Sequence, residues 1–247
     1  MLDLKDKIKR YFAFTKEEIK SLTIVILLLG FIIGFNDGRA SGSIDFFYGL
    51  NMISSIIIVA LTVLVHVATQ RIIALQAGYK LVFRLWWYGL AASVILAFVT
   101  NGKFWVLLPG GIVAMMLEKH RLGKFRYGLN YWPLGLIGFA GPLANVLLAL
   151  FLRMITKISI FSGNVLLEKA ILVNLVYAVF TYLPIPPLDG FNLMYASRLT
   201  YFFTAGLILG AGLLIWLQLS VFWTLLGSLA IGTIVWGTYY HKMGAKR

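Results

Sequence analysis

Long apolar runs, interrupted by short charged loops, constrain the fold of this chain more than any other feature of its sequence. Runs of about 20 apolar residues are long enough to cross a bilayer as helices, and such runs recur along nearly the whole chain. Of the 247 residues, 60% are hydrophobic and only 13% are charged, which excludes an ordinary soluble domain. The sequence therefore predicts an all-α membrane protein, a polytopic helical bundle of about six transmembrane helices in a single domain, 1–247.

The chain divides into a basic leader, a series of spans and a C-terminal pair of helices. Residues 1–20 interleave lysines and arginines with apolar residues, which indicates an interfacial helix on the membrane surface. Thr15 and Glu18 form a capping-box pattern that can begin the first span. Residues 200–247 hold the last two helices and a basic tail. The six expected spans are residues 15–35, 45–71, 129–153, 165–183, 201–217 and 221–240.

A segment of a different kind separates the second span from the third. Residues 72–80 are expected to form a short connection, and residues 84–100 are an apolar run with aromatic residues at its start. Residues 104–117 are rich in β-branched and aromatic residues around a Pro-Gly-Gly sequence, which favours extended structure over a helix. We expect the two runs to enter the membrane and return together, as a re-entrant segment with extended or β structure.

The distribution of basic residues predicts the orientation, because lysine and arginine concentrate in cytoplasmic loops. With the N-terminus inside, 17 of the 22 basic residues lie on the cytoplasmic side. We therefore expect an integral membrane protein whose N- and C-termini are both cytoplasmic. Topology then explains the net charge of +13, and we expect no nucleic-acid partner. The five basic residues expected on the opposite side are Arg39, Lys103, Arg153, Lys157 and Lys169.

The sequence LPIPPLDG at residues 183–190 places a carboxylate, Asp189, inside otherwise apolar sequence. Three prolines in four positions cannot continue a helix, since each lacks a backbone N–H and clashes with the preceding turn. Backbone freed at such a break must face protein or a watery cavity, because lipid offers it no hydrogen-bond partner. An ionisable group at that depth is energetically costly and is by default a candidate functional residue.

A histidine far away in the sequence is expected at a similar depth. His66 precedes the basic residue Arg71 by five positions, or about 7–8 Å of helix rise, and Asp189 precedes Arg198 by nine. Both side chains should therefore approach the membrane from its cytoplasmic side, although 123 residues separate them.

Three motifs follow one another along this part of the chain: HVATQ at 66–70, GPLAN at 141–145 and TYLPIPPLDG at 181–190. In order, spacing and membrane setting they resemble the site-2 protease family of intramembrane zinc metalloproteases, which has an HExxH helix, a GPxxN helix and an NxxPxPxxDG segment. The resemblance covers roughly residues 45–195, the expected core, and residues 104–117 are similar to the family's re-entrant β-structure. It also suggests a prokaryotic cytoplasmic membrane.

The resemblance implies a zinc site that is incomplete in this chain. In the family, two histidines and the aspartate bind zinc, and the glutamate acts as general base on the metal-bound water. His66 matches the first ligand and Asp189 the third, whereas Gln70 occupies the position of the second histidine. Val67 occupies the position of the general base. We expect His66, Gln70 and Asp189 to form a degenerate metal site without a catalytic residue; the expected cofactor is none, with bound zinc as the open alternative.

Two further positions correspond to residues that the family uses around its substrate. Thr181 stands where the NxxPxPxxDG segment begins with the asparagine associated with holding the substrate strand. Asn145 ends the GPxxN match. The resemblance makes both candidate substrate-binding residues.

Simpler interpretations of these residues also stand. Asp189 would cap the helix that follows the prolines, and Asn145 and Asn174 would hold helices together by hydrogen bonds. His66 alone would be an ordinary hydrogen-bonded residue of the bundle. A missing base could be replaced by Glu118 or His120, which lie in the charged loop after the re-entrant segment.

From these features we expect a pseudoprotease, a membrane protein that binds or regulates transmembrane segments of other proteins without cleaving them. The alternatives are an active intramembrane zinc metalloprotease with unusual ligands, and a structural subunit of a membrane complex or transporter. The expected partners are the lipid bilayer and transmembrane segments of other membrane proteins. The absence of cysteine excludes disulfides, thiolate metal ligands and a cysteine nucleophile.

Overall fold

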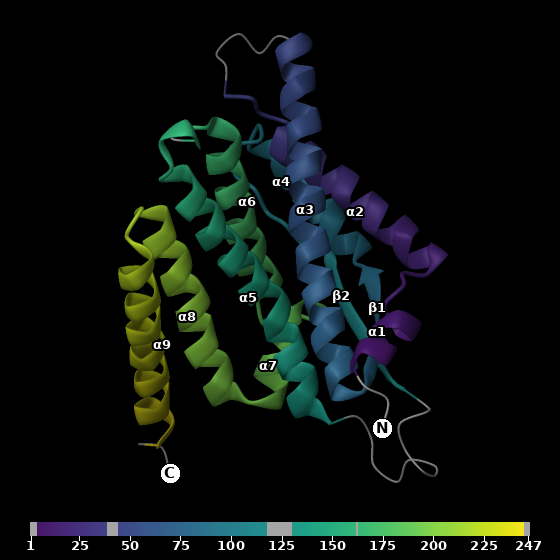
Figure 1. The fold of residues 1–247 in the computed structure, drawn as a ribbon, viewed down its shortest axis with the longest axis vertical. Helices are drawn as coiled ribbons and strands as arrows, with labels where there is room; N and C mark the ends of the chain where they lie inside the picture. The colour runs from purple at the N-terminus through teal and green to yellow at the C-terminus, as the bar shows by residue number, and fades with distance from the viewer. Residues whose placement is uncertain (1–3, 39–43, 118–129, 162, 245–247) are drawn as a thin grey trace.

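The computed structural model describes residues 4–38, 44–117, 130–161 and 163–244, and these are predominantly helical. Helices α3, α5 and α6 form the middle of the bundle, the α8–α9 hairpin lies at one edge, and α2 and the strands lie at the other (Figure 1). The elements are α1 (Leu4–Tyr11), α2 (Lys16–Gly34), α3 (Phe46–Ala77), β1 (Tyr79–Leu85), α4 (Trp87–Val99), β2 (Gly110–Met116), α5 (Tyr131–Thr156), α6 (Val165–Thr181), α7 (Asp189–Ala196), α8 (Arg198–Trp216) and α9 (Val221–Gly244).

Each of the six predicted spans contains a helix, which confirms the predicted all-α membrane bundle. Within the described residues, four helices are long and apolar enough to cross a membrane: α3, α5, α8 and α9. The other two helices within the expected spans, α2 and α6, do not meet this criterion of length and apolar composition. The α2 helix carries charged residues in its first turns, and α6 has 17 residues, slightly fewer than a membrane span needs.

Residues 79–116 form two strands that enclose a helix. Strands β1 and β2 pair antiparallel, from Tyr79 opposite Met116 to Leu85 opposite Gly110, and α4 connects them. The predicted extended structure in residues 104–117 is therefore confirmed by β2. The expectation for residues 72–80 was wrong, because α3 continues to Ala77 and β1 begins at Tyr79. Every second residue of β1 up to Phe83 is buried, as expected for one face of a strand.

Glycines allow the helices of the bundle to pack closely. A Cβ added to Gly30 of α2 would lie 2.6 Å from a side-chain carbon of Ile56 in α3, and one added to Gly206 of α8 would lie 2.9 Å from Gly232 in α9. Membrane helices lack a hydrophobic driving force for association, so close backbone approach at small residues contributes much of their attraction.

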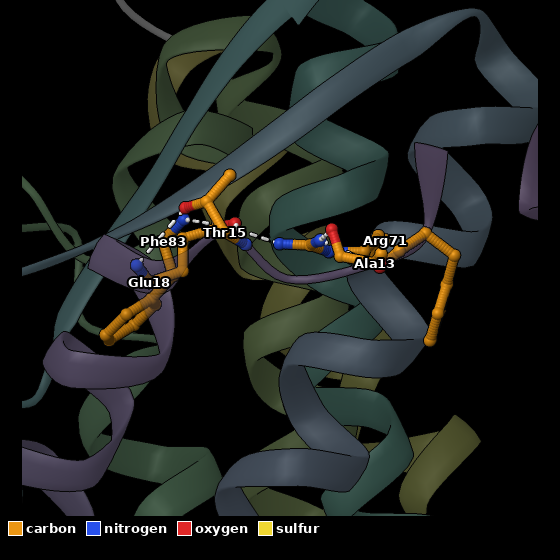
Figure 2. A network of polar contacts seen from close by, with 6 residues as sticks. Ala13, Thr15, Glu18, Arg71 and Phe83 are labelled. Carbon is orange, nitrogen blue, oxygen red and sulfur yellow. Dashed lines mark hydrogen bonds and ion pairs between the residues drawn. The ribbon is translucent and has the colours of Figure 1, made fainter. Parts of the chain in front are cut away.

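A buried ion pair joins the N-terminal part of the chain to the bundle. Glu18 of α2 pairs with Arg71 of α3, and each residue is only 1% exposed. Glu18 also accepts a hydrogen bond from the backbone N–H of Phe83 in β1, at 3.1 Å. Arg71 donates to the backbone carbonyls of Phe12 and Ala13. Figure 2 shows how Glu18 of α2, Arg71 of α3 and Phe83 of β1 come together.

The same glutamate completes the predicted capping box. The Thr15 hydroxyl accepts from the backbone N–H of Glu18, and the Glu18 carboxylate accepts from the backbone N–H of Thr15 at 2.8 Å. Glu18 therefore completes the cap of α2, forms an ion pair with Arg71 of α3 and accepts a hydrogen bond from the outer edge of β1.

Removing one member of this pair should be costly. Glu18→Ala leaves the Arg71 charge buried without its partner, so we expect the free energy of unfolding to fall by about 3–5 kcal/mol, measured by unfolding of the detergent-purified protein. Glu18→Leu combined with Arg71→Met should be less destabilising than Glu18→Ala, because it buries no unpaired charge. The exposed neighbour Glu17 provides the control: equal losses in Glu17→Ala and Glu18→Ala would contradict this account.

Candidate functional site

The structure brings together His66 and Asp189, the two residues singled out in the sequence. His66 lies on α3, and Asp189 is the first residue of α7. The imidazole Nε2 and the carboxylate Oδ2 are 2.7 Å apart, and each residue is only 2% exposed. The pair is therefore a buried hydrogen-bonded ion pair or neutral pair, depending on the position of one proton.

The break between α6 and α7 positions the carboxylate. The chain leaves α6 at Thr181, passes through the prolines and enters α7 at Asp189. A Cβ on Gly190 would lie 1.9 Å from the carbonyl oxygen of Tyr182, so only glycine permits the chain to turn back this tightly. A Cβ on Gly138 of α5 would lie 2.6 Å from the carbonyl oxygen of Asp189, so α7 is pressed directly against α5.

This geometry does not support the interpretation of Asp189 as a helix cap. Leu188 occupies the N-cap position of α7, and no side-chain hydrogen bond caps that end of the helix. The Asp189 carboxylate instead points to His66 through Oδ2, while Oδ1 has no hydrogen-bond partner among the described protein groups.

The imidazole of His66 is enclosed by a glycine and a tyrosine. A Cβ on Gly141 of α5 would lie 2.4 Å from His66 Nε2, so the GPLAN motif supplies the space in which the ring sits. The ring of Tyr177 on α6 meets the imidazole edge-on, with ring centroids 5.2 Å apart. Sequence analysis missed Tyr177; its position four residues before Thr181, one helical turn away, was the available signal.

Further buried amides lie on the same helices. Gln70 is fully buried one turn after His66, and Asn145 is fully buried one turn after Gly141. Neither amide has a hydrogen-bond partner among the described residues, and neither has His66 Nδ1. Most buried polar groups in folded proteins are hydrogen-bonded, so these unpartnered groups make this part of the bundle a candidate polar site.

Other predicted residues take part in local contacts. The Thr181 hydroxyl donates to the carbonyl oxygens of Tyr177 and Ala178 in its own helix. The Asn174 side chain donates to the Ala170 carbonyl, also within α6. These bonds stay inside one helix and do not join helices. Glu118 and His120 lie outside the described residues.

Strand β2 runs alongside the proline break. A Cβ on Gly111 would lie only 1.8 Å from the carbonyl oxygen of Pro187, so the strand touches the loop that carries Asp189. The outer edge of β1 is engaged by Glu18 through the N–H of Phe83. The β1–β2 sheet is therefore adjacent to the candidate site, with β2 as the strand beside the loop.

The donor set does not fit a zinc site of the usual composition. Within the described part of the chain, no group of three or more His, Cys, Asp or Glu side chains comes together. His66 and Asp189 supply two ligands and are bonded directly to each other, and the nearest equivalent of a second histidine is the amide of Gln70. An amide oxygen suits magnesium or calcium better than zinc.

The close fit of Gly141 against the imidazole can be tested directly. Gly141→Ala should displace the ring, weaken the bond to Asp189 and lower the free energy of unfolding by about 1–3 kcal/mol. The measurement is thermal unfolding together with the ¹⁵N resonance of the His66 ring. Gly49→Ala on α3 is the control, because nothing lies within 4 Å of a Cβ there. An unchanged His66 resonance in Gly141→Ala would contradict the fit.

Comparison with known proteins identifies a relative. No family model matches the chain, and no solved structure matches it. A protein of Methanocaldococcus jannaschii described as a "Putative zinc metalloprotease" is 32% identical over 182 residues, which cover 72% of this chain and 84% of that protein. The chain therefore belongs to the metalloprotease family of this archaeal protein.

Proposed function

We propose that this chain is a site-2 protease-like pseudoprotease: a membrane protein that holds transmembrane segments of other proteins without hydrolysing them. The observation that carries the proposal is the direct His66–Asp189 bond in a site where Val67 and Gln70 replace a base and a ligand. The relationship to a metalloprotease family accounts for the arrangement, and the substitutions account for the loss of its chemistry.

The physical argument rests on what the replaced side chains cannot do. Valine cannot accept a proton, and a positioned general base is worth about 10²–10⁴-fold in rate. The amide of Gln70 binds zinc more weakly than imidazole does. Without the third ligand the metal is poorly held, and without the base its water is not deprotonated. The pair then acts as a structural joint between α3 and α7.

The metal content of the purified protein tests this proposal. Elemental analysis should give far less than one zinc per chain in wild type, His66→Ala and Asp189→Ala alike. Val67→Glu combined with Gln70→His rebuilds the HExxH pattern and should raise the zinc content toward one per chain. If the buried glutamate makes this double variant misfold, Gln70→His alone provides the test. Gln76→His, an exposed position on the same helix, is the control.

The rival function is an active zinc metalloprotease with unusual ligands, which the description of the archaeal relative favours. It predicts stoichiometric zinc in the wild type that is lost in both His66→Ala and Asp189→Ala. That result would replace the pseudoprotease proposal.

The bound segment would join the sheet at β2. The edge of β1 that faces away from β2 is already engaged by Glu18, so strand addition is directed to the other edge. The observed register turns the N–H groups of Ile112, Ala114 and Met116 away from β1. Thr181 and Asn145 would contribute polar contacts to the unwound segment.

A photoreactive residue at Met115, which is exposed on β2, should crosslink to other membrane proteins in native membranes. Ala114→Pro removes one outward N–H and should reduce these crosslinks several-fold while leaving the β1–β2 pairing intact. The same photoreactive residue at Trp236, exposed on α9, gives the background level. Crosslinks that are insensitive to Ala114→Pro would contradict strand addition.

The proposed orientation places both termini and the polar site toward the cytoplasm. Helix α1, the C-terminal end of α9 and helix α7 all lie at the same end of the bundle (Figure 1). The basic residues of the leader and tail support a cytoplasmic location for that end.

A further inference from the structure

A second polar site lies at the opposite end of the bundle from the basic leader and tail. It is a cavity of about 430 Å³ bounded by the ends of α3, α5, α6 and α8 and by residues 36–38. We name it the polar cavity; its lining includes the side chains of Trp105, Arg153, Glu168, Lys169 and Trp216.

The polar cavity holds charges of both signs at fixed positions. Arg153 is 6% exposed; its Nη1 donates to the Glu168 carboxylate, while its Nε is buried without a hydrogen-bond partner among the described residues. Lys169 donates to Asn51 at 2.7 Å and to Ser55 at 2.6 Å. The described lining therefore presents two cations, Arg153 and Lys169, beside the carboxylate of Glu168, which is partly exposed. Groups of both signs at fixed positions suit a zwitterionic headgroup better than a simple anion.

An apolar groove continues from the polar cavity toward the middle of the bundle. The groove has a volume of about 220 Å³, lies between α6 and α8, and shares Leu172, Leu175 and Trp216 with the cavity. Its lining is almost wholly hydrophobic, and it includes Gly212 of α8. Nothing lies within 4 Å of a Cβ built on Gly212, although this glycine is buried, so the space beside it is open.

We propose that the polar cavity and the groove together bind one zwitterionic phospholipid. The phosphate pairs with Arg153 and Lys169, and the ammonium group with Glu168. One acyl chain lies in the groove between α6 and α8. Trp105 and Trp216 border the headgroup, as tryptophans do at membrane interfaces. The combination of a cavity that holds charges of both signs with a continuous apolar groove is what an amphiphile requires, and it separates this ligand from a soluble phosphate.

Native mass spectrometry of the full chain in detergent, titrated with phosphatidylethanolamine, tests the groove. Gly212→Leu fills the open space without a backbone clash and should weaken lipid binding about tenfold or more, because it excludes several methylene groups. Gly237→Leu on α9 is the matched control, since a Cβ there also has no neighbour within 4 Å. Equal affinities in the two variants would overturn the proposal.

A second pair of variants tests the headgroup. Lys169→Gln keeps hydrogen-bonding capacity toward Asn51 and Ser55 but loses its charge, and should weaken binding about tenfold. Lys157→Gln, an exposed position near the same end of α5, should have no effect. Phosphatidylglycerol, which lacks the ammonium group, should bind more weakly than phosphatidylethanolamine.

Three results would contradict the lipid assignment. Equal binding of the two lipids would remove the zwitterion argument. Full competition by glycerophosphoethanolamine, which has no acyl chains, would make the ligand a soluble phosphate compound. A co-purifying polypeptide displaced from the groove by Gly212→Leu would make the occupant a protein segment.

Discussion

The hydrogen bond between His66 and Asp189 is the contact on which the rest of this structure depends. An acid and an imidazole are costly to bury, and more so within a bundle surrounded by lipid. Here each supplies the other with a hydrogen-bond partner. The bond fixes α7 against α3, because the prolines before α7 have no backbone N–H groups with which to hold that segment in place. Removing either side chain would leave the other buried and unpaired, which is the more expensive condition.

The glycines around this pair all allow close packing. Gly111, Gly138, Gly141 and Gly190 each lie so close to a neighbouring atom that a Cβ would collide with it. Two of those neighbours, the carbonyl oxygens of Pro187 and Asp189, belong to the segment that carries the carboxylate, and a third is the imidazole itself. Close backbone approach thus substitutes for larger side chains at the site.

Much of this arrangement could be predicted, because apolar periodicity and the positions of charged residues determine it. The spans, the capping box at Thr15 and the extended segment that became β2 follow from local sequence. Counting residues back to Arg71 and Arg198 predicts a similar depth for His66 and Asp189, and the resemblance of the motifs predicts that they share one site. Strand β1 was missed because its alternation covers only seven residues between two apolar runs. The Glu18–Arg71 pair and the contact of Gly141 with His66 depend on helix rotation and on how the leader folds back, and local sequence does not encode either.

In the proposed function, the site around His66 and Asp189 hydrolyses no peptide bond. The most direct measurement is to reconstitute the full chain in liposomes with a panel of transmembrane segments, supply zinc in excess, and analyse the segments by mass spectrometry. The account predicts that every segment is recovered intact. Site-specific cleavage that disappears with a chelator and in Asp189→Ala would contradict it.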